Sequence, residues 1–196
     1  MKHPDNIKKV SALSPDYIGF IFYKKSPRYL TQIPENIPEG IKKTGVFVNE
    51  EYDQILDKVR LFNLQAVQLH GEESVELCEK LRHQNLEVIK AFSIDDDFNF
   101  EKIHSYQKVT DYFLFDTKGK NYGGNGLAFN WSILQNYRFS HPFFLSGGIG
   151  LEHSEEIKKI NDSSLPLVGI DLNSKFEIAP GLKDIQKLKK MKESLL

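Results

Sequence analysis

Short apolar runs rich in β-branched and aromatic residues recur along the chain, and each is followed by a more polar stretch whose apolar residues have helical spacing. This alternation is typical of repeated βα units. The predicted strands are residues 16–23, 42–48, 65–69, 87–92, 111–116, 142–146 and 165–171. Helices are predicted over residues 51–62, 72–83, 98–107, 130–137 and 151–160, with two more at the ends, 5–13 and 182–195.

Most of the predicted strands are apolar on both faces, as expected of strands that lie between a core and a layer of helices. Without a Rossmann fingerprint the repeat favours a barrel, although periodicity alone leaves an open doubly wound sheet as an alternative. We therefore predict an α/β fold of the (β/α)8 TIM-barrel class. No linker or change of charge marks a boundary, so residues 1–196 are expected to form a single domain. The lysines from Lys183 to Lys192 are interpreted as the solvated face of the terminal helix.

Composition and charge argue against several classes of protein. Lys plus Arg is 26 and Asp plus Glu is 27, so a net charge of −1 gives no global reason to expect a nucleic-acid or membrane partner. A hydrophobic content of 40% supplies a sizeable core and argues against disorder. The single cysteine excludes an intramolecular disulfide and fits a reducing compartment. No apolar run is long enough to span a bilayer, and we therefore predict a cytoplasmic protein.

Residues just after each strand are the candidates for chemistry, because barrels build their sites at the C-terminal ends of the strands. The guanidinium of Arg28 suits a carboxylate clamp, with an ordinary surface arginine as the alternative. Asp116 ends an apolar run, a setting that can raise its pKa and suit a general acid, whereas the alternative is an aspartate that caps a helix or braces a loop. His70 ends the third run, where catalysis and a structural hydrogen bond are both open.

Two glycine-rich loops follow late strands, residues 122–126 and 146–150. Backbone N–H groups at such loops bind phosphate, although Gly147 and Gly148 alone are also explained by a tight turn. The six histidines and the cysteine show no metal-ligand spacing, so no metal is predicted. Cys78 has apolar neighbours at helical spacing and is expected to be a buried core thiol.

Several motifs follow one another in order through essentially the whole chain. They include Gly19-Phe20-Ile21-Phe22, Ser26-Pro27-Arg28-Tyr29, Val67-Gln68-Leu69-His70-Gly71-Glu72, Phe115-Asp116-Thr117, Leu145-Ser146-Gly147-Gly148 and Gly169-Ile170-Asp171-Leu172-Asn173-Ser174. This combination closely resembles phosphoribosylanthranilate isomerase. The resemblance implies a (β/α)8 barrel of tryptophan biosynthesis that works without a cofactor. It converts N-(5-phosphoribosyl)anthranilate to 1-(2-carboxyphenylamino)-1-deoxyribulose 5-phosphate by an Amadori rearrangement.

The resemblance also implies roles for individual residues. Asp116 matches the general acid that protonates the furanose ring oxygen. Arg28 matches the residue that faces the anthranilate carboxylate, and Asp171 matches a polar contact to the substrate. His70 is predicted to bind substrate as well. The implied phosphate-binding residues are Gly124, Gly126, Gly147, Gly148, Asn173 and Ser174.

The N-terminus departs from the family pattern. The family carries its catalytic cysteine, the general base, in a Lys-x-Cys-Gly motif at the end of the first strand, and this chain starts at the methionine that follows that motif. We therefore expect a barrel that lacks its first strand, with little or no isomerase activity. Cys78 cannot substitute, because it belongs to a later helix. The two unpaired sheet edges favour a homodimer.

Three interpretations stay open. A start upstream of Met1 would restore the strand, whereas a degenerate protein would bind phosphoribosyl ligands without turnover. A different phosphate-binding barrel enzyme, such as an epimerase or indole-glycerol-phosphate synthase, is the weaker alternative, because the Ser-Pro-Arg-Tyr motif and the Asp116-Thr117 pair argue against it. The length of 196 residues lies just below the roughly 200 of the smallest barrels, in agreement with a missing strand.

Overall fold

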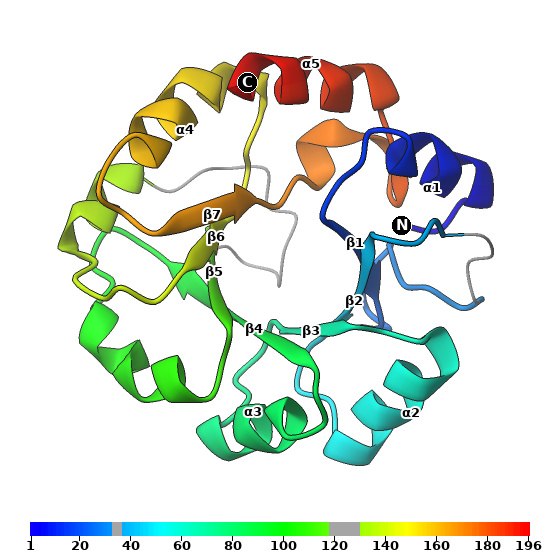
Figure 1. Cartoon of the computed structure of the whole chain (residues 1–196), viewed down its shortest axis with the longest axis horizontal. Helices are drawn as coiled ribbons and strands as arrows, with labels where there is room; N and C mark the ends of the chain where they lie inside the picture. The colour runs from blue at the N-terminus through cyan, green and yellow to red at the C-terminus, as the bar shows by residue number, and fades with distance from the viewer. Residues whose placement is uncertain (33–36, 118–129) are drawn as a thin grey trace.

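The computed structural model describes residues 1–32, 37–117 and 130–196 (Figure 1). Seven of its described strands form one parallel sheet in the order of the sequence, curled into a barrel wall with the helices outside. The seven strands of this sheet are β1 (Tyr17–Ile21), β2 (Lys42–Phe47), β3 (Ala66–Leu69), β4 (Glu87–Ile94), β5 (Tyr112–Thr117), β6 (Phe143–Leu145) and β7 (Leu167–Ile170). All seven predicted strands are therefore confirmed, with ends that shift by a few residues.

The helices also occur where the pattern predicts them, but two of them differ in type. The α-helices are α1 (Pro4–Ser11), α2 (Tyr52–Phe62), α3 (Val75–Arg82), α4 (Ser154–Asn161) and α5 (Ile185–Leu195), and the 3₁₀ helices are η1 (Phe100–Lys108), η2 (Trp131–Asn136), η3 (Leu151–His153) and η4 (Ser174–Phe176). Apolar residues three or four apart suit both helix types, which explains why spacing alone did not separate η1 and η2 from α-helices. In the described part of the chain no helix is both long enough and apolar enough to cross a membrane.

The barrel is open between β1 and β7 (Figure 1). Among the described strands β1 pairs only with β2, and β7 pairs only with β6. The backbone nitrogen of Met1 lies at the open side of β1 and donates to the carbonyl of Gly19 at 2.7 Å. On β7, Val168 is 51% exposed. The expectation of a barrel that lacks its first strand is thus confirmed.

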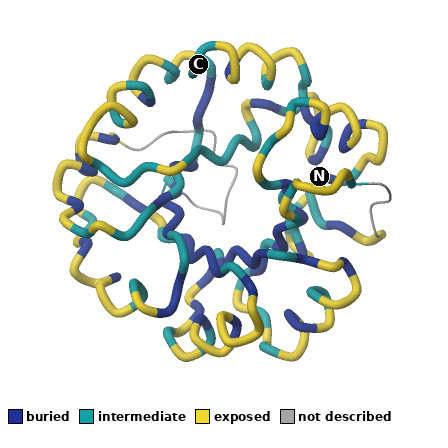
Figure 2. Tube along the Cα trace, viewed as in Figure 1, coloured by how far each residue is buried: buried dark blue, intermediate teal, exposed yellow. Residues whose placement is uncertain are grey.

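Side chains along the strands alternate between two apolar layers, as the two-residue period of a strand requires. The outer layer joins strand residues such as Leu69 with helix residues such as Ile7 of α1 and Ile55 of α2 in one buried apolar cluster. The inner layer is smaller and is centred on Ile89 and Leu114, which face the barrel interior. Figure 2 shows the same division, with buried positions along the strands and exposed positions on the outer side of the helices.

A short hairpin precedes the last helix. Strands β8 (Glu177–Ala179) and β9 (Leu182–Lys183) pair antiparallel, so the helix predicted from residue 182 begins only at Ile185. Asp184 caps α5, because its carboxylate accepts the N–H groups of Gln186 and Lys187 at 3.1 Å each.

Lys183 is not part of a solvated face. Its residue is only 9% exposed, and its ammonium donates to the carbonyl of Leu172 at 2.9 Å and to Oδ1 of Asn173 at 3.0 Å. The interpretation of Lys183 as a solvated lysine was therefore wrong. The reason is tertiary, since the hairpin folds Lys183 back onto acceptors that a helical pattern does not show.

Candidate active site

Asp116 lies at the carboxyl end of β5, and strand alternation places it on the same face as Leu114, which lines the barrel interior. Its side chain is 7% exposed. Oδ2 of Asp116 lies 3.0 Å from Nε2 of His70, and Oδ1 accepts the N–H of Thr117 at 2.9 Å. Both carboxylate oxygens therefore have a nitrogen partner, and the carboxyl group is fixed in the mouth of the barrel.

His70 follows β3 and connects Asp116 to a deeper residue of that strand. Nε2 of Gln68 lies 3.0 Å from Nδ1 of His70. The side chains of Gln68, His70 and Asp116 thus form one hydrogen-bonded row from the barrel interior to the mouth. The structural hydrogen bond that the sequence left open for His70 is present, and a contact of His70 with substrate stays a prediction.

A buried ion pair supports the turn that follows His70. Nζ of Lys90 lies 3.0 Å from Oε2 of Glu73, and their side chains are 2% and 1% exposed. Lys90 also donates to the carbonyls of Leu69, Gly71 and Ala91 at 3.2, 2.7 and 2.9 Å. Sequence reasoning missed this pair, because a lysine in an apolar strand shows no partner until the neighbouring turn is folded.

The loop after β6 approaches Asp116 closely. Gly147 and Gly148 have φ angles of +84° and +64°, in the left-handed region that favours glycine. A Cβ on Gly147 would lie 2.6 Å from Oδ1 of Asp116 and closer still to Thr117. The tight turn that the sequence offered as one interpretation is present, and phosphate binding by Gly147 and Gly148 stays a prediction.

Asp171 follows β7 and faces the same mouth. The hydroxyl of Ser146 donates to its Oδ2 at 3.4 Å. Burial raises the pKa of Asp171, the charge of Lys183 opposes this increase, and the charge of Asp116 adds to it. The two carboxyl groups are therefore within electrostatic reach of each other.

Arg28, in the loop after β1, is fixed by a carboxylate that the sequence did not suggest. Its Nε donates to Oε1 and Oε2 of Glu177 at 3.1 and 2.8 Å, and its Nη2 donates to Oε2 at 2.6 Å. Burial alone would raise the pKa of Glu177, but the hydrogen bond from Arg28 and the charge of Lys183 outweigh it, and the pKa lies below its ordinary value. Arg28 is thus an oriented cation with its side chain 14% exposed, in place of the surface arginine that was the alternative.

The structure gives fewer contacts for the other residues that are predicted to bind phosphate. Ser174 begins η4, and Oδ1 of the neighbouring Asn173 accepts from Lys183. Gly124 and Gly126 lie outside the described residues. Phosphate binding by all four stays a prediction.

Cys78 lies in α3, away from this row of side chains, and is fully buried. Burial raises the pKa of its thiol to about 12. The prediction of a buried core thiol is confirmed, and Cys78 is not a thiolate near neutral pH.

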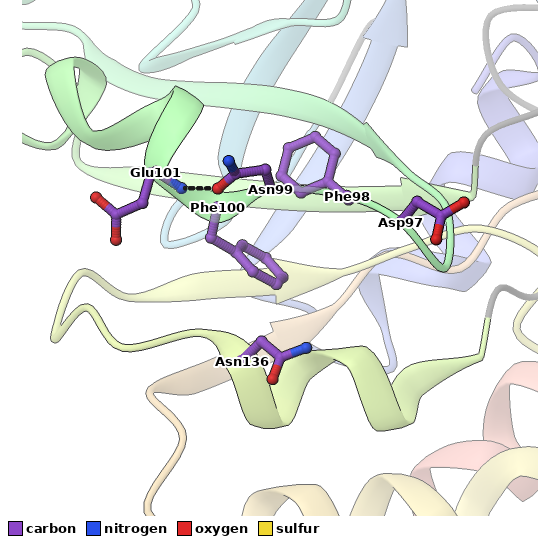
Figure 3. Close-up of a pocket in the computed structure, with 6 residues that line it drawn as sticks. All are labelled: Asp97, Phe98, Asn99, Phe100, Glu101 and Asn136. Atoms are coloured by element: carbon purple, nitrogen blue, oxygen red, sulfur yellow. Dashed lines mark hydrogen bonds between the residues drawn. The ribbon is translucent and has the colours of Figure 1, made fainter.

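A separate hollow of about 300 Å³ lies between the loop after β4 and the helix η2 (Figure 3). Its loop is ordered locally, because Oδ1 of Asn99 accepts the N–H of Glu101 at 2.9 Å. The residues that line the hollow are Asp97, Phe98, Asn99, Phe100, Glu101 and Asn136. No predicted site residue is among this described lining, so the hollow is distinct from the barrel mouth.

Fold and mouth together define the class of protein: a parallel α/β barrel whose acidic and basic side chains gather at the carboxyl ends of its strands. Within that class the chain belongs to the N-(5'-phosphoribosyl)anthranilate isomerase family, whose model matches residues 1–194. The resemblance that the sequence motifs carry is thereby confirmed.

Individual relatives agree with this assignment. The N-(5'-phosphoribosyl)anthranilate isomerase of Parabacteroides distasonis is 44% identical over 202 aligned positions, which cover 100% of this chain and 90% of the relative. A crystal structure of mutually generated monomers of the dimeric phosphoribosylanthranilate isomerase from Thermotoga maritima is 31% identical, with a TM-score of 0.78 and coverage of 98% and 93%. A phosphoribosylanthranilate isomerase in complex with reduced 1-(o-carboxyphenylamino)-1-deoxyribulose 5-phosphate is 32% identical, with a TM-score of 0.81 and the same coverage.

Proposed function

We propose that the mouth of this barrel binds N-(5-phosphoribosyl)anthranilate and promotes its Amadori rearrangement to 1-(2-carboxyphenylamino)-1-deoxyribulose 5-phosphate. The observation that carries the proposal is the carboxyl group of Asp116, fixed in the mouth beside His70 at 3.0 Å. The relative bound to a reduced form of this product supports the same substrate class, a phosphorylated sugar that carries an aromatic carboxylate.

Ring opening is the step that Asp116 performs. In its protonated form Asp116 gives its proton to the furanose ring oxygen while the bond from that oxygen to C1 breaks and the anthranilate nitrogen forms a Schiff base. The carboxylate that remains accepts the N–H of Thr117 and faces Nε2 of His70. Nitrogen donors placed where charge develops lower the barrier to such a proton transfer.

Arg28 and the loops around Asp116 orient the substrate. Glu177 occupies Nε and Nη2 of Arg28, and in the described part of the chain no acceptor binds Nη1. We assign Nη1 to the anthranilate carboxylate. The backbone of Gly147 and Gly148 is assigned to the phosphate, together with Asn173, Ser174 and the loop that carries Gly124 and Gly126.

The second step requires a base that removes the proton from C2 of the sugar. The family motif assigns this step to a cysteine, and the one cysteine of this sequence is Cys78, whose burial raises its thiol pKa to about 12. We therefore expect substrate binding with weak turnover. A barrel that binds phosphoribosyl compounds without converting them is the second candidate function, favoured by the same observation.

Two measurements on this chain separate the candidates. Calorimetry with the reduced product tests binding, and a coupled assay of isomerisation tests turnover. We expect binding together with slow turnover, which Asp116→Asn lowers by roughly 10²–10⁴-fold while binding persists. Binding without turnover supports the second candidate, and the absence of both contradicts the proposal.

A strand added at Met1 sharpens the test. An apolar strand that ends in Lys-x-Cys-Gly would pair with the open edges of β1 and β7, and a matched strand with alanine in place of the cysteine is the control. We expect strong turnover from the first variant and only improved stability from the second. Equal activity of the two variants would refute the requirement for a thiol base.

The open edges and the single cysteine support two further assignments. We propose that the chain associates as a homodimer through its unpaired strands, since exposed edges pair readily with other strands. The scarcity of cysteine supports a reducing, cytoplasmic location.

A further inference from the structure

Gln68 is a buried amide between two apolar residues of the neighbouring strands. It is 7% exposed on β3, and its register partners on the neighbouring strands are Val46 and Ile89. A polar side chain in such a place costs free energy unless it is hydrogen-bonded. Its amide nitrogen lies 3.0 Å from Nδ1 of His70, which in turn faces Asp116.

The contact between Gln68 and His70 determines which ring nitrogen of neutral His70 carries the proton. A neutral imidazole has one N–H donor and one nitrogen acceptor, and an amide nitrogen only donates. The amide nitrogen of Gln68 can therefore pair only with an unprotonated Nδ1. The ring proton of neutral His70 is then on Nε2, where it donates to Oδ2 of Asp116.

We propose that Gln68 is a positioning residue that fixes the tautomer of His70, so that an N–H donor always faces the carboxyl group of Asp116. This inference rests on the proposed function only for its kinetic consequence. In the opposite tautomer an unprotonated Nε2 would face Asp116 and favour retention of the acid's proton. Gln68 thereby favours release of that proton to the substrate without touching the substrate itself.

The tautomer is measured directly by ¹⁵N NMR of the imidazole nitrogens in the free protein. We expect His70 to carry its proton on Nε2, with Nδ1 unprotonated, and Gln68→Met to populate both tautomers. Gln68→Glu keeps the shape of the side chain but can only accept, and it is therefore expected to protonate Nδ1. The matched control is Gln107→Met, which removes a similar contact of 3.1 Å to Nδ1 of the exposed His104.

Kinetics test whether Gln68 acts through His70. Gln68→Met is expected to lower kcat roughly threefold to tenfold, the factor that one net hydrogen bond corresponds to, with KM unchanged. His70→Gln supplies an amide donor to Asp116 that has no tautomers. In that background Gln68→Met should change kcat by less than about twofold, whereas a merely structural role would lower kcat equally in both backgrounds.

The NMR and kinetic measurements distinguish failure of this inference from failure of the proposed function. If the chain neither binds the reduced product nor shows isomerase turnover, the proposed function fails, and the NMR measurement still decides the role of Gln68. A proton on Nδ1 of His70 in the native protein overturns the inference. So does an unchanged tautomer in both folded Gln68 variants, or an equal loss of kcat in the native and His70→Gln backgrounds.

Discussion

Replacing Lys90 by methionine is expected to destabilise the protein more than any substitution on its surface. Lys90 and Glu73 form an ion pair of 3.0 Å in which both side chains are at most 2% exposed. Methionine fills much of the same space but leaves the carboxylate of Glu73 buried without a cation. It also removes the donor from three backbone carbonyls.

The magnitude follows from these contacts. Breaking a buried pair on one side typically costs about 3–5 kcal/mol, because the remaining charge is uncompensated. For a chain of this size each kcal/mol lowers Tm by roughly 2–4 °C, so the loss corresponds to roughly 6–20 °C. Glu73→Gln in the same protein removes the orphaned charge and retains an oxygen for the N–H groups of Asn49 and Gly71. We therefore expect the double variant to be more stable than Lys90→Met alone.

Urea denaturation monitored by fluorescence measures the native protein, Lys90→Met, Glu73→Gln and the double variant. The control is Lys189→Met, which removes an exposed pair of 3.9 Å with Glu193 and should change the free energy of unfolding by less than about 1 kcal/mol. A loss below about 1 kcal/mol for Lys90→Met would show that the pair is solvated, and additive effects of Lys90→Met and Glu73→Gln would show that the two side chains do not interact.

Further substitutions address the mouth and the edges. Gly147→Ala places a Cβ on a residue with φ of +84° beside Asp116. It should lower the free energy of unfolding, measured by urea denaturation, by roughly 1–3 kcal/mol and lower kcat on the order of 100-fold. An unchanged free energy of unfolding and an unchanged kcat would contradict this prediction. Burial raises the pKa of Asp171 in the folded protein above 3.8, its value in the unfolded chain. Between these two pKa values the folded protein holds a proton that the unfolded chain has lost, so the free energy of unfolding falls as the pH rises from 3.8 to the folded pKa. Asp171→Asn should therefore be more stable than the native protein near neutral pH, with a gain that disappears towards pH 3.8, whereas a pH-independent difference would argue against the titration. Val168→Lys places a charge on the exposed edge of β7 and should reduce self-association in sedimentation velocity, and unaltered association would locate the contact elsewhere.

The strands could be predicted from sequence because each carries a local signal. Runs such as Tyr112–Thr117 are apolar on both faces, which only a strand between two layers requires. The hairpin of β8 and β9 had no such signal, because Glu177–Ala179 and Leu182–Lys183 are short and partly exposed. The hairpin also contacts Asn6 of α1, which lies 177 residues before Lys183 and gives no local sign of this contact.

The candidate site divides in the same way. Asp116 and His70 end apolar strands, and the order of strands in a barrel brings such ends together, so their meeting could be expected. Glu177 and Lys183 could not be found, since nothing near them in sequence indicates that one binds Arg28 and the other Asn173. Gln68 was passed over because a polar residue in a buried strand has meaning only once its partner is placed.

The gap in the sheet between β1 and β7 gives Glu177 and Lys183 a structural role. Sheet hydrogen bonds do not join β1 to β7, so other contacts hold the two sides of the mouth in place. Asn6 of α1 exchanges two hydrogen bonds with the backbone of Lys183, at 2.8 and 2.7 Å, and Arg28 of the loop after β1 binds Glu177 of β8. These contacts join α1 and Arg28 to the hairpin of β8 and β9 without a closed sheet. On the proposed function we therefore expect substrate binding to depend on these contacts and turnover to depend on the base supplied at the open side, so that the two are separable by mutation.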